Sequence, residues 1–322
     1  MRILIRTAML LLFNLGISCL AFAQEYPNKP IQLVVPYPPG GVVDITGRLL
    51  ADQLSRELGK QVIVVNKPGA GGTIGAEFVA RSPADGYTII LGGAATHAFA
   101  PAMYKQLRYD PIKDFVAITQ FTEGPLALTV NKASGIASID EFFKMLKNKG
   151  DSVNYSSNGI GTFPHLSVEL LKQKTGTKAT HIPYPGGSQA MVAVLSNEVL
   201  FSQNHLPVVL PQSQAGRVRI LATTGSSRST ILPDIPTLKE SGYDVVASAW
   251  FGLFAPAGTP EPIVQRLYEA TVAAAKSPTL REKLALQGDE ISVTGPTKFL
   301  AFQKNELDKW KIVITTAEIK PE

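Results

Sequence analysis

The sequence predicts an α/β fold of two lobes, each a mostly parallel sheet flanked by helices. Short apolar runs of strand type alternate with segments of helical periodicity along most of the chain, a pattern typical of parallel sheets. Glycine-rich loops follow several of the strands. Two further apolar segments, residues 124–130 and 250–256, separate the repeating units. We interpret them as two crossover segments between the lobes.

The first 23 residues are expected to be a signal peptide and not part of the fold. Arg2 and Arg6 give a basic start, residues 8–20 are apolar, and residues 21–23 form an A-x-A cleavage site. Such a signal peptide would direct export of the chain and be cleaved after Ala23. No later segment is long and apolar enough to span a bilayer. We therefore expect a periplasmic protein that is not itself membrane-spanning.

The only cysteine, Cys19, lies inside this leader. Acylation of Cys19 is an alternative, but Gly16-Ile17-Ser18 before it lacks the leucine usual at such sites. Without a cysteine in the mature chain, stability must come from packing and not from disulfides. Removing Arg2 and Arg6 from the 31 basic residues leaves 29 against 26 acidic ones, a net charge of +3. No block of Lys and Arg occurs, so nucleic acid is not expected as a partner.

The mature chain begins with strand–loop–helix units. A strand is predicted at residues 31–35, because this run is continuously apolar, as in strands buried on both faces. A helix is predicted at residues 42–58, and Gly59 follows it in the place of a left-handed cap. The next strand, helix and strand are predicted at residues 61–65, 73–81 and 87–91.

The middle of the chain repeats this scheme. A helix is predicted at residues 138–149, with Ser138 as N-cap and Glu141 three residues later. Strands are then predicted at residues 152–155, 180–183 and 218–223, and helices at 164–174 and 189–195. The proline-rich connection at residues 226–242 is expected to contain one short helix, and a C-terminal pair of helices is predicted at 261–276 and 296–311.

These elements suggest how the chain is divided. We expect a signal peptide at residues 1–23, the first part of lobe 1 at 24–124, an inserted lobe 2 at 125–249, and a C-terminal part completing lobe 1 at 250–322. An inserted lobe requires two crossings. A deep cleft between the lobes is the natural binding site of such a design.

The glycine-rich loops favour an anion. In "IQLVVPYPPGGVVD", residues 31–44, a strand leads through a tight turn into a helix, with no lysine or arginine in the turn. Unpaired N–H groups and a helix start can hold a carboxylate without a basic side chain. Glycine and proline could also serve only to make tight connections. Several such loops on both candidate lobes favour a shared site.

Nucleotide sites are not supported. A P-loop needs Gly-Lys-Ser/Thr, which follows no strand here, and "GAGGTIG" at residues 69–75 has Ile74 where the dinucleotide fingerprint needs glycine. No metal site is predicted either, because the four histidines show no H-x-H or H-x-x-x-H spacing. We expect no cofactor and no metal.

Catalysis is not predicted. No G-x-S-x-G elbow is present, although a hydrolase using the same cleft stays an alternative. His97 and His165 lie on or next to candidate loops and would either contact ligand or hydrogen-bond a loop. Asp44 precedes Arg48 by four residues, which is typical of a surface pair. Asp44 could also meet a ligand ammonium group, but we favour a role in supporting the loop.

The chain resembles a known family. Residues 26–92 resemble the N-terminal half of the Bug family, the periplasmic solute-binding receptors of tripartite tricarboxylate transporters. The similarity continues through "YDPIKDF", "GTFPHLSVELLK", "HIPYPGG", "LPDIPTLKESGY" and "WFGLFAPAGTPEPIVQRL". The resemblance implies a periplasmic-binding-protein (Venus-flytrap) fold, a small carboxylate ligand such as a dicarboxylate or related organic acid, and membrane permease subunits as partners. It implies a monomer that binds and does not catalyse.

The resemblance also implies a set of ligand contacts. In the family, backbone groups and ordered water hold one carboxylate without a salt bridge. On lobe 1 the expected contacts are Tyr37, Pro38, Pro39, Gly40, Gly41, Gly71, Gly72, Thr73, Thr96 and His97. On lobe 2 the candidates are Ser156, Ser157, Asn158, Gly159, Thr162, His165, Tyr184, Gly186, Gly187 and Asn204.

One segment departs from the family pattern. In "NEVLFSQNHLP", Leu200 and Asn204 stand where members commonly have aspartates. Losing a negative group near the cleft could change ligand choice, or it could remove only a surface charge. Delivery to a permease is the function the resemblance favours, and a ligand sensor for a signalling partner is the alternative.

Overall fold

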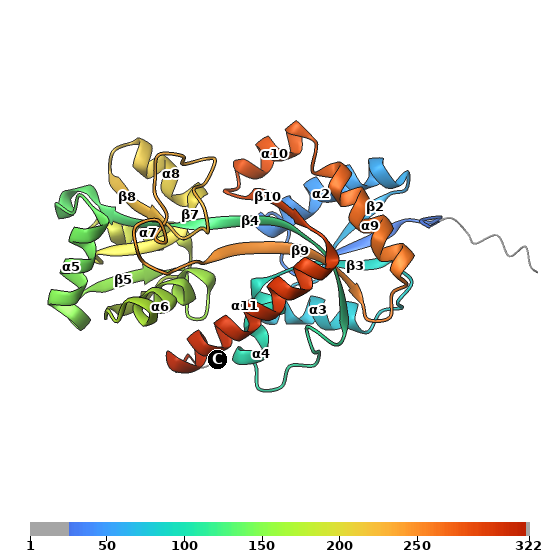
Figure 1. Cartoon of the computed structure of the whole chain (residues 1–322), viewed down its shortest axis with the longest axis horizontal. Coiled ribbons are helices and arrows are strands. Elements are labelled where there is room, and N and C mark those ends of the chain that lie inside the picture. Colours follow the sequence, from blue (N-terminus) through green and yellow to red (C-terminus); the bar gives the residue numbers. More distant parts are fainter. Residues whose placement is uncertain (1–25, 320–322) are drawn as a thin grey trace, which may run out of the picture.

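The computed structural model describes residues 26–319, which form two α/β lobes side by side along the long axis (Figure 1). The predicted fold class is confirmed. The predicted signal peptide and its cleavage after Ala23 lie outside the described residues. Within residues 26–319, no helix combines the length and the apolar character that a bilayer crossing needs.

The first lobe is built around β1 (Ile31–Val35), which lies between its parallel partners β2 (Val62–Asn66) and β3 (Thr88–Gly93). The four apolar residues of β1 are fully buried, and only Gln32 is exposed. The helices that lie beside this sheet are α2 (Val42–Leu58), α3 (Thr73–Ala80), α9 (Glu261–Ala274) and α10 (Pro278–Ala285).

Two long antiparallel strands join the lobes. β4 (Phe115–Asn131) pairs with β9 (Ser248–Pro256) and β10 (Glu290–Thr294) in its first part. Its last six residues pair with β7 (Phe201–His205) and β8 (Val218–Thr223) of the second lobe. The predicted boundaries after residues 124 and 249 fall inside these two continuous strands, so the exact limits of the lobes stay a prediction.

The second lobe continues the sheet in the order β4-β7-β5-β6, where β5 (Asn154–Ser157) is parallel to both β7 and β6 (Thr180–Pro183). Its helices are α5 (Ile139–Lys149), α6 (Phe163–Thr175), α7 (Gly187–Leu195) and α8 (Leu206–Gln214). In the core of this lobe, Phe142 packs edge-on against Phe201 with ring centroids 4.9 Å apart.

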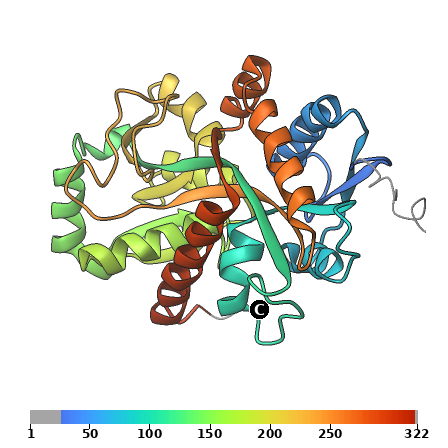
Figure 2. The same ribbon diagram turned by 45° about the vertical axis from the view of Figure 1, so that its right-hand side comes forward.

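The C-terminal helix α11 (Pro296–Thr316) lies alongside the junction of the two lobes, as the turned view shows (Figure 2). Its Trp310 makes edge contacts with Phe99 of the first lobe and Phe163 of the second, at 5.1 and 5.7 Å between ring centroids. The helix α11 therefore packs against both lobes and not only against the one it completes.

One expectation about an element is wrong. Residues 226–242 contain no helix. Thr237 and Glu240 form reciprocal side-chain bonds to each other's N–H, at 2.9 Å each, but Gly242 takes a φ of +89° and ends this turn before a helix develops. The two predicted C-terminal helices are confirmed as α9 and α11, but α10 and β10 between them were not predicted.

Candidate functional site

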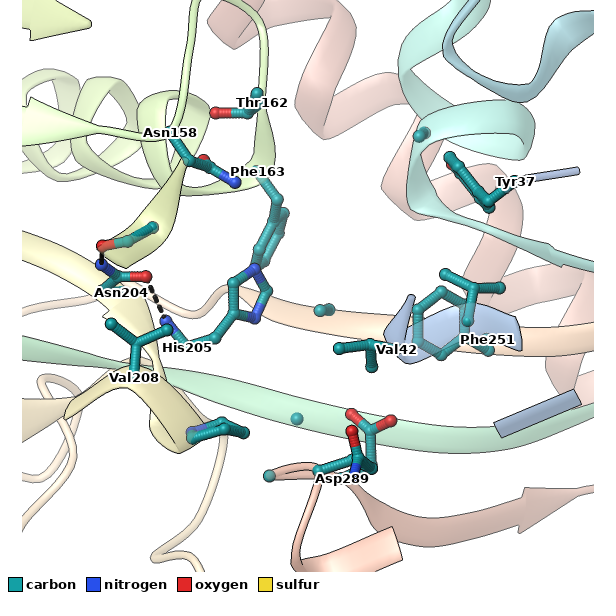
Figure 3. Close-up of a pocket in the computed structure, with 18 of the residues that line it drawn as sticks. Tyr37, Val42, Asn158, Thr162, Phe163, Asn204, His205, Val208, Phe251 and Asp289 are labelled. Atoms are coloured by element: carbon teal, nitrogen blue, oxygen red, sulfur yellow. Dashed lines mark hydrogen bonds between the residues drawn. The ribbon is translucent and has the colours of Figure 1, made fainter. Parts of the chain in front are cut away.

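A cavity of about 560 Å³ lies between the lobes (Figure 3). Both lobes and both crossing strands contribute to its wall, and its size suits a small molecule. Much of the wall is apolar or aromatic. The larger side chains of this kind are Tyr37, Phe99, Met103, Tyr104, Ile160, Phe163, Leu206 and Phe251.

Four helices begin at this cavity. Val42 and Val43 at the start of α2 line it, as do Phe163 of α6, Gly187 of α7 and Leu206 of α8. The first N–H groups of a helix have no partner inside the helix. The N-cap residues of all four helices, Gly41, Thr162, Gly186 and His205, make no side-chain cap bond. Unpaired donors and the positive ends of four helices therefore meet at one cavity, which favours an anion.

Basic side chains do not contribute to the positive electrostatic potential at this cavity. Among the described residues that line the cavity there is no lysine or arginine, and Asp289 is the only acidic residue. The neutral polar groups around the cavity include Asn158, Thr162, Asn204 and His205. Burial lowers the pKa of His205 to about 4, so its imidazole is neutral at pH 7. Within residues 26–319, no group of His, Cys, Asp and Glu side chains is placed to hold a metal ion.

The loop from Tyr37 to Gly41 is held from behind by Asp44. The buried carboxylate accepts hydrogen bonds from Gly40 N and Arg48 Nε, each at 2.9 Å, and from Asn66 Nδ2 at 2.8 Å. Burial alone would raise the pKa of Asp44, but these three bonds lower it to about 2. Because the Gly40 N–H is given to Asp44, it is not free for a ligand.

The loop after β5 is held by two stacked histidines. Gly161 N donates to His165 Nδ1 at 3.0 Å, and the His165 ring stacks on His181 at 3.8 Å between centroids. His181 Nε2 is 2.6 Å from Ser157 Oγ. Burial lowers the pKa of His165 to about 4 and that of His181 to about 3, so both rings are neutral. His165 thus hydrogen-bonds the loop, one of the two roles considered for it.

The structure brings six of the candidate residues together at the cavity, and they come from both lobes. They are Tyr37, Gly71, Asn158, Thr162, Gly187 and Asn204. The other candidates do not line this cavity. They are Pro38, Pro39, Gly40, Gly41, Gly72, Thr73, Thr96, His97, Ser156, Ser157, Gly159, His165, Tyr184 and Gly186.

Three of these residues have side chains that are buried in the core. Thr96 and His97 are fully buried: Thr96 Oγ1 is 2.8 Å from His97 Nδ1, and the imidazole stacks on Phe254 at 3.9 Å between centroids. Ser156 Oγ is likewise buried and donates to Ala190 O at 2.8 Å. Contrary to expectation, these side chains point into the core and not into the cavity.

Two other candidates lie apart from the cavity. Tyr184 donates to Glu198 Oε1 at 2.7 Å on the surface of lobe 2. Thr73 lines a separate pocket of about 320 Å³ on lobe 1. The structure therefore does not place all the predicted contact residues at one cavity with their side chains facing it.

Asn204 does line the cavity, so its departure from the family pattern falls at the candidate site. Its Nδ2 donates to Gly187 O at 3.0 Å and its Oδ1 accepts from His205 N at 2.9 Å (Figure 3). The neutral amide thus ties the start of α7 to the start of α8. Leu200 is not among the lining residues.

Sequence reasoning missed several lining residues, chiefly Val42, Val43, Phe99, Tyr104, Phe163, His205 and Asp289. Phe163 and Val42 directly follow predicted loops, so the first turn of each helix was a usable signal. Asp289 lies in "QGDEIS" between α10 and β10 and carries no local signal of a site.

The chain is similar in sequence to known proteins along most of its length. The family model described as "Tripartite tricarboxylate transporter family receptor" matches residues 46–319. Protein BugT of Bordetella pertussis is 35% identical over 309 residues, which cover 95% of each chain. A UPF0065 protein in the gbd 5' region of Cupriavidus necator is 37% identical over 294 residues, covering 91% of this chain and 89% of the relative.

Several solved structures are also similar to this chain in fold and sequence. A TctC solute-binding protein from Polaromonas has a TM-score of 0.82 at 31% identity, covering 90% of this chain and 99% of that one. R. palustris Rpa4515 with adipate has a TM-score of 0.76 at 32% identity, covering 92% and 100%. MatC from Rhodopseudomonas palustris with bound malate has a TM-score of 0.71 at 31% identity, covering 90% and 100%.

Proposed function

Because the chain belongs to the family of tripartite tricarboxylate transporter receptors, we propose that it captures a small organic carboxylate between its lobes. In this proposal it is an exported, periplasmic solute-binding protein, cleaved after Ala23, that acts as a monomer. It delivers its ligand to the membrane permease subunits of such a transporter. Residues 24–124 and 250–322 form lobe 1, and residues 125–249 form lobe 2.

One observation carries the proposal: four helices begin at one interlobe cavity, and the part of its wall built from residues 26–319 has no lysine or arginine. A carboxylate can accept several short, charge-assisted hydrogen bonds from such N–H groups. The neutral side chains of Asn158, Thr162 and His205 supply further polar contacts. The absence of a salt bridge suits a receptor that must also release its ligand.

The cavity and two similar structures support a proposal for the ligand class. Adipate and malate are named as the ligands of two proteins that share this fold at more than 30% identity. The apolar and aromatic wall can cover a short carbon chain between polar ends. We therefore propose a dicarboxylate or a related organic acid.

Transport requires the lobes to move. The strands β4 and β9 are the extended segments that run from one lobe to the other. We propose that closure occurs by rotation about these strands, so that donors from both lobes reach one ligand. The permease would then recognise the closed form.

Thermal melting with a panel of small mono- and dicarboxylates tests the proposal. A ligand present at a hundredfold excess over its Kd should stabilise the folded chain by about 2.7 kcal/mol. Sodium chloride at equal ionic strength serves as the control for a general salt effect. If no small carboxylate raises the melting temperature above this control, the proposed function is wrong.

A further inference from the structure

Asp289 is an acidic side chain that the proposed function does not use. It lies on the loop between α10 and β10 of lobe 1 and lines the interlobe cavity. In Figure 3 its carboxylate points toward the space between Val42 and His205, on the opposite side of the picture from Asn158 and Thr162. The cavity thus has one acidic side, well apart from its cluster of amide and hydroxyl groups.

This carboxylate is buried and incompletely paired. Asp289 is only 5% exposed, and its Oδ2 has no hydrogen-bond partner among the described residues. The nearby Thr46 hydroxyl opposes the effect of burial on the carboxyl but makes no hydrogen bond of ordinary geometry, because Thr46 Oγ1 is also without a partner. The effect of burial is larger than the effect of Thr46, so the pKa of Asp289 is raised to about 7.

An unpaired carboxylate in such a place costs folding free energy. Burying a charge or a polar group without a partner is unfavourable, and stabilisation returns when a donor arrives. The described residues that line the cavity offer no basic side chain that could pair with Asp289. Besides the nearby Thr46 hydroxyl, a ligand or water in the cavity can supply a donor to Asp289.

The charge pattern also sets the orientation of a ligand. The starts of α6 and α7 and the Asn158 and Thr162 side chains can hold a carboxylate on lobe 2. A second carboxylate placed near Asp289 would be repelled by it, since like charges at short range disfavour ionisation of both groups. An ammonium group at that end would be attracted.

We propose that Asp289 is a specificity-determining residue, and that it selects a ligand carrying an amino group as well as a carboxylate. The ligand carboxylate lies at the starts of α6 and α7, and its ammonium group donates to Asp289. This inference rests on the proposed function, because it assumes a carboxylate in the same cavity. It narrows the ligand from organic acids in general to small aminocarboxylates.

Ligands matched in chain length test this proposal. For three to six carbons, the mature protein is titrated with an ω-aminocarboxylate, the dicarboxylate in which a carboxylate replaces the amino group, and the unsubstituted monocarboxylate. The α-amino acids aspartate and glutamate are compared with succinate and glutarate in the same way. An aminocarboxylate is expected to bind at least about tenfold more tightly than its matched partners, as a charge-assisted hydrogen bond allows.

The variant Asp289→Asn then assigns this selectivity to one side chain. It keeps the shape and one acceptor oxygen but removes the negative charge, so aminocarboxylate affinity should fall about tenfold or more while monocarboxylate affinity changes little. Asp52→Asn is the matched control, because Asp52 is an exposed residue of α2 paired with Arg56. Its binding should equal that of the wild type.

The outcomes separate the two proposals. If dicarboxylates or monocarboxylates bind and aminocarboxylates do not, the role of Asp289 is refuted while the proposed function stands. If no carboxylate of any kind binds, both are refuted. Equal aminocarboxylate affinity of wild type and Asp289→Asn also overturns the inference. Should Asp289→Asn not fold, the wild-type comparison of matched ligands decides alone.

Discussion

Asp44 shows how a residue outside the cavity can shape it. Its ion pair with Arg48 involves a half-exposed side chain and contributes little to stability. The bonds from Gly40 N and Asn66 Nδ2 matter more, since both groups are partly buried and fix the loop that carries Tyr37. The acidic side chain thus stabilises a loop beside the proposed anion site without facing the cavity.

Replacing Asp44 by Asn should lower the free energy of unfolding at pH 7 by about 1–3 kcal/mol, because buried donors lose a charged acceptor. Urea unfolding measures this difference. The pKa of Asp44 is lowered from 3.8 to about 2, so its contribution is present above pH 4 and is lost as the pH falls toward 2. A difference between wild type and variant that stays constant down to pH 2 would contradict this assignment.

At the scale of single residues, prediction from sequence succeeded where the contacts are local. Asp44 and Gly40 are four residues apart, so the support of the loop could be inferred from the turn itself. Thr96 and His97 follow a strand directly, but whether they face the cavity or the core depends on Phe254 of a distant strand. Asp289 reaches the cavity only through the packing of α10 and β10, which no local pattern reveals.

At the scale of elements, the starts of helices carry the account. Val42 is the first residue of α2, and its side chain is 43% exposed. Gly41 before it has φ −79° and ψ 169°, a conformation that proline tolerates in its preceding residue. Proline is also favoured at the first position of a helix, where its missing N–H breaks no helical bond.

The variant Val42→Pro should therefore fold normally but lose one donor at the cavity. We expect the affinity for the bound carboxylate to fall about tenfold, the effect of one charge-assisted hydrogen bond. Val42→Ala is the matched control, because it removes the same side chain and keeps the N–H. Equal affinities of the two variants in calorimetric titration would show that α2 does not hold the ligand.

Element limits were predictable where turn residues mark them. The strands at residues 31–35, 180–183 and 218–223 and the helix at 42–58 match the structure residue for residue. The polar strand β7, "FSQNH", was missed because its buried polar side chains find partners such as Ser167 and Gly187 from other elements. Such pairing depends on tertiary structure and leaves no periodic pattern.

At the scale of the whole molecule, the two lobes and their two crossings were predictable because both crossings are apolar segments between repeated units. The role of α11 was not, since the packing of Trp310 on both lobes joins residues far apart in the sequence. This contact and the strands β4 and β9 connect the two lobes.

The central claim is that a small carboxylate binds between the lobes, and one calorimetric titration tests it most directly. Ala249 lies on β9 and lines the cavity, so Ala249→Trp should fill the space where the ligand lies. We expect one ligand to bind per wild-type molecule, no binding to Ala249→Trp, and unchanged binding to Ala137→Trp at an exposed position before α5. Unchanged affinity of a correctly folded Ala249→Trp variant would place the ligand elsewhere and contradict the account.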